Sequence, residues 1–147
     1  MQKSPVEVFH ALFPNLSGIE FLEKQWPDNA YWCDGNIDRL PNALKVPELQ
    51  SIETQGQKYR ERITFGNAKT SSRTVGVDHI SLEILLRMGL SLYLPEIENT
   101  LPQLREVLSH VEAAVDAPPG SARAGVFIAP AENGVTCHFD PEEVFSS

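Results

Sequence analysis

The stretch Asn-Gly-Val-Thr-Cys-His-Phe-Asp-Pro, at positions 133–141, decides the fold that this sequence predicts. Asn-Gly is the strongest short signal for a β-hairpin turn. The residues after it alternate between apolar and polar, which predicts a short strand with His138 and Asp140 on one face. Pro141 ends the strand, because its nitrogen cannot donate a ladder hydrogen bond.

The two polar residues of this strand are candidate metal ligands. At about 3.3 Å per residue, His138 and Asp140 lie roughly 6–7 Å apart along the strand. Two such side chains can converge on one cation, as in the two-His, one-carboxylate facial site for iron(II). The stretch also has a purely structural explanation, since Asp140 and Pro141 are typical of the first positions of a helix.

The residues before the turn predict the second strand of this hairpin. Positions 124–129 form a continuous apolar run, which is typical of a buried strand. We therefore expect Arg123–Ala129 to pair with Val135–Asp140 through a turn at 130–134. Such a hairpin fits a jelly-roll barrel.

The N-terminal region predicts two short helices. Ser4-Pro5 and Ser17-Gly18-Ile19-Glu20 carry helix-start patterns, and Pro14 and Pro27 end the two helices. We expect them to form an N-terminal helical cap, residues 1–28, with Trp26 in its core. Residues 29–147 would form the second domain.

The middle of the chain predicts short elements. Strands are expected at 30–33, 51–54, 59–65 and 90–94, short helical turns within 36–50, and an exposed loop at 66–76. A helix is expected at 78–88, with Ile80, Ile84, Leu85 and Met88 on its apolar face.

The longest helix is expected to begin near residue 100 and to end before Pro118. Its apolar stripe consists of Leu101, Leu104, Leu108, Val111 and Val115. Glu112 is assigned to its polar face. Helices and short strands together predict an α+β fold.

One strand carries a candidate anion site. Arg60, Arg62 and Thr64 share a face of the expected strand 59–65. The Arg pair could bind an anionic substrate, but solvated charges on an edge strand explain it better.

Composition narrows the function classes. The 147 residues carry a formal charge of −8, with 20 acidic and 12 basic side chains, which disfavours nucleic acid as a partner. Cys33 and Cys137 form no CxxC motif, so a cysteine-based zinc site is not expected. The N-terminus lacks a signal-peptide core, and charged residues interrupt the apolar region 80–94. We expect a soluble, cytoplasmic protein without a membrane partner.

Three stretches of the chain together resemble the first part of a JmjC-type, cupin-like oxygenase domain. They are Phe21–Trp26, then Gly125–Pro130 with Asn133-Gly134, and finally Thr136–Phe145, which is similar to the family's His-x-Asp segment. The resemblance implies a cupin-like double-stranded β-helix after the helical cap. It also implies a dioxygenase that uses iron(II) and 2-oxoglutarate to hydroxylate or demethylate protein or peptide side chains. His138 and Asp140 would be the first two iron ligands.

The family's second histidine lies on a later strand, downstream of the motif, and this sequence stops at Ser147. His10, His79 and His110 all precede the motif. We therefore expect a truncated domain, which would need a C-terminal half or a second copy in a homodimer to complete the site. The alternative is a non-catalytic interaction or regulatory module derived from a cupin-like domain. No catalytic residue beyond the metal ligands is assigned.

Overall fold

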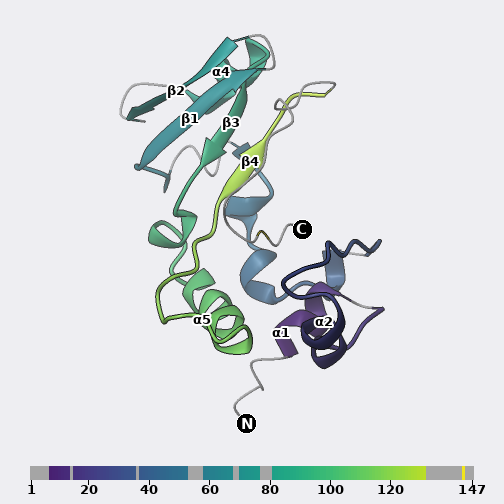
Figure 1. Ribbon diagram of the computed structural model, residues 1–147. Helices are drawn as coiled ribbons and strands as arrows, with labels where there is room; N and C mark the ends of the chain where they lie inside the picture. The colour runs from purple at the N-terminus through teal and green to yellow at the C-terminus, as the bar shows by residue number, and fades with distance from the viewer. Residues whose placement is uncertain are drawn as a thin grey trace. The chain divides into compact units, whose positions relative to one another are not determined.

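The computed structural model describes residues 7–13, 15–35, 37–52, 58–67, 70–76, 81–131 and 144. Helices and a four-stranded antiparallel sheet make up these residues, which confirms the predicted mixture of helix and sheet. The chain divides into two compact units that alternate along the sequence (Figure 1). We call residues 7–45 and 103–122 the helical unit, and residues 46–102 and 123–131 the sheet unit. The boundary expected after residue 28 stays a prediction.

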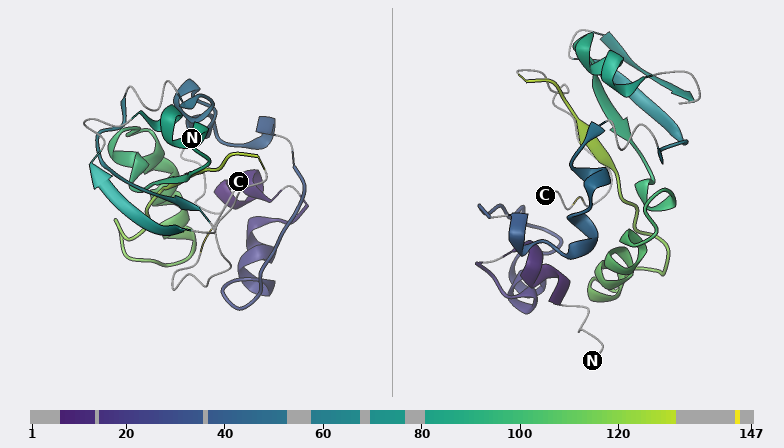
Figure 2. Two further views of the ribbon diagram at one scale, coloured as in Figure 1. Left: turned by 90° about the horizontal axis from the view of Figure 1, so that it is seen from above. Right: turned by 180° about the vertical axis from the view of Figure 1, so that it is seen from behind.

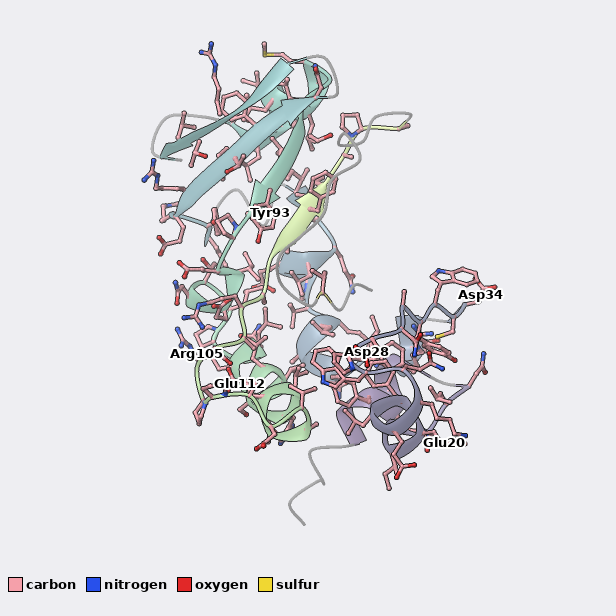
Figure 3. The ribbon with its side chains drawn as sticks, viewed as in Figure 1. Glu20, Asp28, Asp34, Tyr93, Arg105 and Glu112 are labelled. Carbon is pink, nitrogen blue, oxygen red and sulfur yellow. The ribbon has the colours of Figure 1, made fainter. Side chains whose placement is uncertain are left out.

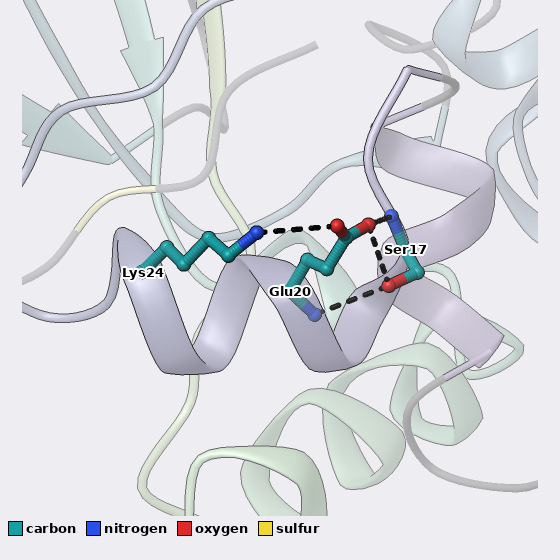
Figure 4. A network of polar contacts seen from close by, with 3 residues as sticks. All are labelled: Ser17, Glu20 and Lys24. Carbon is teal, nitrogen blue, oxygen red and sulfur yellow. Dashed lines mark hydrogen bonds and ion pairs between the residues drawn. The ribbon is translucent and has the colours of Figure 1, made fainter.

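The helical unit contains α1 (Glu7–Leu12), α2 (Gly18–Lys24) and α5 (Leu104–Ala114), with two 3-10 turns, η1 (Ile37–Arg39) and η2 (Asn42–Leu44). The predicted capping box of α2 is present (Figure 4). The Glu20 amide donates to Ser17 Oγ at 3.1 Å, and the Ser17 amide donates to Glu20 Oε2 at 3.3 Å. Lys24, one turn later, pairs with Glu20 at 3.3 Å.

An aromatic cluster forms the core of the helical unit. Phe9 and Phe21 are buried, and their ring centroids lie 5.1 Å apart. Phe13 stacks on Phe21 at 4.5 Å, and Tyr31 meets Phe13 edge-on at 5.4 Å. Trp26 packs against the same cluster, which confirms its expected place in the core.

Helix α5 begins at Leu104, four residues later than expected. The prediction for Glu112 is wrong, because this side chain is buried and not on a solvated face. Its carboxylate accepts a hydrogen bond of 2.8 Å from the Ala122 amide, which brings the segment after α5 back against the helix. The spacing of apolar residues in a helix cannot show that Glu112 binds a backbone amide ten positions later.

The sheet unit contains β1 (Arg62–Asn67), β2 (Thr70–Gly76), β3 (Ser91–Leu94) and β4 (Val126–Ile128), in the spatial order β2-β1-β3-β4 (Figure 2). It also holds α4 (Leu82–Arg87) and the 3-10 turns η3 (Pro47–Leu49) and η4 (Ile97–Asn99). Every neighbouring pair of strands is antiparallel. Helix α4 packs against β3.

One face of this sheet is buried. Ile63, Leu92 and Leu94 are fully buried, and α4 contributes the buried Leu82 and Leu85. Along β1 and over Leu92–Leu94 of β3, these apolar side chains alternate with exposed or partly exposed ones, as expected for a sheet with one packed face, although Ser91 is buried as well. The strand predicted at 90–94 is confirmed as β3, and its predicted alternation holds for residues 92–94.

Three sequence predictions about this unit are wrong. The loop expected at 66–76 contains β2, which pairs with β1 and forms a hairpin. The run 124–129 is not buried throughout, because Phe127 in β4 is 50% exposed. Ile84 of α4 and its C-cap Met88 are exposed, and Leu82 is buried together with the predicted Leu85.

Other predictions have mixed outcomes. The 3-10 turns within 36–50 match the expected helical turns, whereas residues 30–33 carry no strand. The strand expected at 51–54 and the second half of the hairpin, Val135–Asp140, include residues outside the described ranges. No helix in the described ranges is long and apolar enough to cross a membrane.

Candidate functional site

The second face of the sheet carries the candidate functional site. Thr64 of β1 stands opposite both Thr74 of β2 and Tyr93 of β3, and Tyr93 stands opposite Phe127 of β4. Directly opposed residues point to the same side of a sheet, so these four form one row across all four strands. The face that bears this row, with Arg62, Ser91 and Gly125 beside it, is called the open face below.

The row on the open face has its two polar residues on β1 and β2 and its two aromatic residues on β3 and β4. The hydroxyl groups of Thr64 and Thr74 share a hydrogen bond of 2.9 Å. Tyr93 is 44% exposed and Phe127 is 50% exposed, although both lie in strands. Figure 3 shows the Tyr93 side chain beside the β3–β4 pair. Two neighbouring exposed rings make this part of the face suited to contact with an apolar group.

Gly125 allows the Tyr93 ring to lie close to the backbone that leads into β4. A Cβ atom at position 125 would stand 2.6 Å from Cε2 and 2.8 Å from the hydroxyl of Tyr93. Any other residue would therefore displace the ring. The glycine at this position therefore permits the observed position of the Tyr93 ring on the open face.

Ser91 holds a buried hydroxyl on the same side as Thr64 and Tyr93. Gly66 of β1 is its partner in the register, and the residue is only 3% exposed. Within the described residues its Oγ has no hydrogen-bond partner. Because almost all buried polar groups are paired in folded proteins, this hydroxyl is a position where a further donor or acceptor is expected.

A carboxylate fixes the start of β4. Glu98, 4% exposed, accepts a hydrogen bond of 3.0 Å from the Ala124 amide. The Ala124 carbonyl accepts one of 2.9 Å from Ile97. Arg123 completes the anchor through ion pairs of 3.4 Å with Glu96 and 3.9 Å with Glu98. Thus η4 holds the chain in the position from which β4 begins.

Tyr59 links the ends of the two inner strands, β1 and β3. Its hydroxyl lies 2.7 Å from the Pro95 carbonyl and 3.0 Å from the Arg62 carbonyl, and it can donate to either. Burial raises the pKa of Tyr59 well above its ordinary value, and the nearby Glu61 and Glu96 raise it further. The phenol is therefore a permanent donor that ties the end of β3 to the start of β1.

The predicted basic face is present in part. Arg62 and Thr64 share a face of β1, as expected, and Arg62 is exposed. Arg60 precedes the strand, and its guanidinium donates to the Tyr59 carbonyl at 2.8 Å. Arg62 makes no ion pair within the described ranges, so its guanidinium is the cation that the open face offers to an anion.

The predicted iron ligands, His138 and Asp140, lie outside the described residues. Within the described ranges, no group of three or more His, Cys, Asp or Glu side chains could hold a metal ion. His10 is exposed on α1 and His110 is partly buried on α5, both in the helical unit. Cys33 forms no disulfide.

The donor chemistry nevertheless fits the cofactors that the resemblance implies. An imidazole nitrogen and a carboxylate oxygen are ligands that non-heme iron(II) accepts. The Arg62 guanidinium and the unpartnered Ser91 hydroxyl are groups that can hydrogen-bond a carboxylate such as those of 2-oxoglutarate. The fit therefore rests on donor types and not on an assembled ligand set.

Sequence reasoning missed most of the open face. Ser91, Thr74, Tyr93 and Phe127 were not predicted as site residues. The alternation of residues 90–94 was visible in the sequence, but the strand register that aligns Tyr93 with Thr64 and Phe127 was not. A scan against models of known protein families finds no match to this chain, and no curated protein matches it.

Proposed function

We propose that this chain carries the first part of a JmjC-type, cupin-like domain that works with iron(II) and 2-oxoglutarate. Its substrate class would be a side chain of a protein or peptide. The observation that supports the proposal most is the open face of an antiparallel sheet whose last described strand, β4, precedes the His138-x-Asp140 motif along the chain. A cupin-like barrel is built from such sheets, with its ligands on inward-facing strand positions.

In this proposal the residues of the chain have separate tasks. His138 and Asp140 would hold the iron, which with 2-oxoglutarate would supply the oxygen activation. Arg62 would pair with a carboxylate of 2-oxoglutarate, and the Ser91 hydroxyl would gain the hydrogen bond that it lacks among the described residues. Tyr93 and Phe127 offer an apolar surface to the substrate chain. A third iron ligand comes from another segment or another subunit.

A metal titration tests the ligand assignment. We would titrate manganese(II), as an air-stable substitute for iron(II), into the wild type, His138→Ala and Asp140→Ala by calorimetry. His10→Ala is the matched control, because His10 is an exposed histidine of the helical unit. Loss of binding in both motif variants, with binding retained in the control, is the expected result. Equal affinities in all four proteins would contradict the assignment.

Absorption spectroscopy tests the proposal that Arg62 binds 2-oxoglutarate. 2-Oxoglutarate added to the iron(II)-loaded wild type should produce a visible charge-transfer absorption, and Arg62→Gln should require a higher 2-oxoglutarate concentration to produce it. Arg73→Gln is the control, since Arg73 stands opposite Phe65 and thus on the other face of the β1–β2 hairpin. If Arg62→Gln and Arg73→Gln behave alike, Arg62 does not bind the cofactor.

A non-catalytic interaction module is the second candidate. It is favoured by the exposed Tyr93 and Phe127 rings and by the position of β4 at the edge of the described strands. Such a module would bind its partner equally well with and without a chelator, whereas substrate binding by an oxygenase should respond to metal and 2-oxoglutarate. Partner binding measured in both conditions separates the two candidates.

A further inference from the structure

The two tryptophans of the chain, Trp26 and Trp32, have opposite environments. Trp26 packs against the aromatic cluster of the helical unit. Trp32 is 80% exposed, more than any other large hydrophobic side chain that the structure describes. Tryptophan combines a large apolar surface with an N–H donor, and it is among the residue types most enriched in the binding hot spots of interfaces. Trp32 is therefore a candidate contact residue for a partner.

The chain just before Trp32 is anchored to the helical unit. The Tyr31 ring meets the Phe13 ring edge-on, with the ring centroids 5.4 Å apart. The Asn29 amide donates a hydrogen bond of 2.7 Å to the carbonyl of Gln25, the C-cap of α2. Trp32 thus extends from a segment whose position is already fixed. Less conformational freedom is lost when a partner binds such a segment, which favours affinity.

The stretch around Trp32 is acidic. Residues 25–38 contain Asp28, Asp34 and Asp38 and no Lys, Arg or His. All three aspartates are exposed, and Asp28 and Asp34 form no ion pair with any described residue (both are labelled in Figure 3). Arg39 is the next cation along the chain, but its Nε and Nη1 atoms are buried. This stretch therefore presents carboxylates to solvent beside an exposed indole.

We propose that Trp32, Asp34 and Asp28 form a docking site for a basic peptide segment of another protein. A Lys or Arg side chain of the partner lies over the indole face in a cation–π contact, for which tryptophan is the best of the aromatic residues. Its charge is shared with the Asp34 carboxylate. A second basic residue of the partner pairs with Asp28.

The spacing along the chain permits one cation to reach both groups. Trp32 and Asp34 are two positions apart, so their Cα atoms lie within about 7 Å of each other. Both side chains are long enough to close on one ammonium or guanidinium group from that separation. Asp28 lies four positions before Trp32, within about 14 Å of chain, which matches a second basic residue a few positions further along the partner.

Charge selects the class of partner. An acidic segment is repelled by a chain of formal charge −8 and by the free carboxylates of this stretch. An apolar segment could cover the indole, but it would take Asp34 out of water without a partner, which costs free energy. A basic segment satisfies the ring and the carboxylates together. The proposal concerns the helical unit alone and holds whether or not His138 and Asp140 bind iron.

Peptide titration tests the proposal. A short peptide of alternating arginine and glycine is titrated into the wild type by calorimetry, and the same peptide with glutamate in place of arginine is the control ligand. The arginine peptide should bind, and the glutamate peptide should not. Because the charged groups are solvent-exposed, the affinity for the arginine peptide should fall as salt is added.

Variants of the chain test the contact residues. Trp32→Leu keeps an apolar side chain but removes the ring, and it should weaken binding by about two- to fivefold, whereas Trp32→Phe should weaken it less. Asp34→Asn should also weaken binding, by up to about fivefold, and should reduce the dependence on salt. Asp116→Asn is the matched control, because it removes the same charge from an exposed position of the same unit. It should bind like the wild type.

Four outcomes would overturn the proposal. The first is a wild type that binds neither peptide, or both equally. The second is an affinity for the arginine peptide that does not change with salt, which would indicate an apolar contact. The third is equal binding by Trp32→Leu and the wild type. The fourth is an Asp116→Asn protein that loses as much affinity as Asp34→Asn, which would show that only net charge matters.

Discussion

Helix α2 of the helical unit and the strands of the sheet unit are anchored by hydrogen bonds that span different distances along the chain. In α2, the contacts Ser17–Glu20 and Glu20–Lys24 join residues three and four positions apart. In the sheet unit, Glu98 reaches the Ala124 amide 26 positions away, and the Tyr59 hydroxyl reaches Pro95 36 positions away. Local anchors can be recognised as sequence motifs, whereas distant ones depend on a fold that is already formed.

The largest expected effect on stability distinguishes a substitution on the buried face of the sheet from one on the open face. Leu92→Ala removes a fully buried side chain and should lower the free energy of unfolding by about 2–5 kcal/mol. Its neighbour Tyr93 points to the open face, so Tyr93→Ala should cost about 1 kcal/mol or less. Urea denaturation followed by circular dichroism measures both. Similar losses in the two variants would mean that the open face is packed.

The second prediction concerns the long-range anchor of β4. Glu98→Ala leaves the Ala124 amide without its acceptor and should cost about 1–3 kcal/mol. Glu96→Ala is the matched control, because Glu96 pairs with the same Arg123 but is exposed, and such pairs contribute about 0–1 kcal/mol. Thermal unfolding of both variants tests the difference. Equal melting temperatures would show that β4 does not depend on Glu98.

The third prediction tests the local anchor of α2. Ser17→Ala removes the N-cap and should cost about 1 kcal/mol. Hydrogen bonds from the backbone and hydroxyl of Ser17 hold the pKa of Glu20 below its usual range. A carboxyl with a lowered folded-state pKa stabilises the fold above its ordinary pKa, about 4.3, and this contribution is lost as the pH falls.

The pH dependence provides the control for that prediction. Below the ordinary carboxyl range, the difference between Ser17→Ala and the wild type should become smaller but not vanish. Protonation of Glu20 weakens its hydrogen bond with the Ser17 hydroxyl, whereas the bond from the Glu20 amide to that hydroxyl does not titrate. Denaturant midpoints measured near neutral pH and in acid give the comparison. A difference that is constant between the two conditions would show that the cap acts without Glu20.

The smallest effect on stability is expected at the buried hydroxyl of Ser91. Ser91→Ala removes a buried polar atom that has no hydrogen-bond partner among the residues that the structure describes, so stability should change little or rise slightly. Ser91→Val, which has a different shape, is the control for packing at the same position. A loss of more than about 1 kcal/mol in Ser91→Ala would reveal a partner for the hydroxyl and weaken its assignment to ligand binding.

Features that depend on local contacts could be predicted from the sequence, whereas features that depend on distant pairing could not. The capping box at Ser17 and the core position of Trp26 were predicted, because both depend on neighbours within one or two turns. Strand β2 was missed, because polar residues 70–74 become a strand only by pairing with β1. The open face was missed for the same reason. His138 and Asp140 were found by motif alone and stay a prediction.

The order of the elements along the chain also affects the synthesis of this protein, its proteolysis and the fragments that can be expressed. Residues 103–122 of the helical unit lie in the chain between β3 and β4 of the sheet unit. During synthesis, β4 can therefore pair with β3 only after α5 has left the ribosome. A protease cut in the segment 115–125 would separate β4 from the strands before it. Expressed pieces that stop before residue 126 lack β4, so neither unit can be isolated as one continuous fragment.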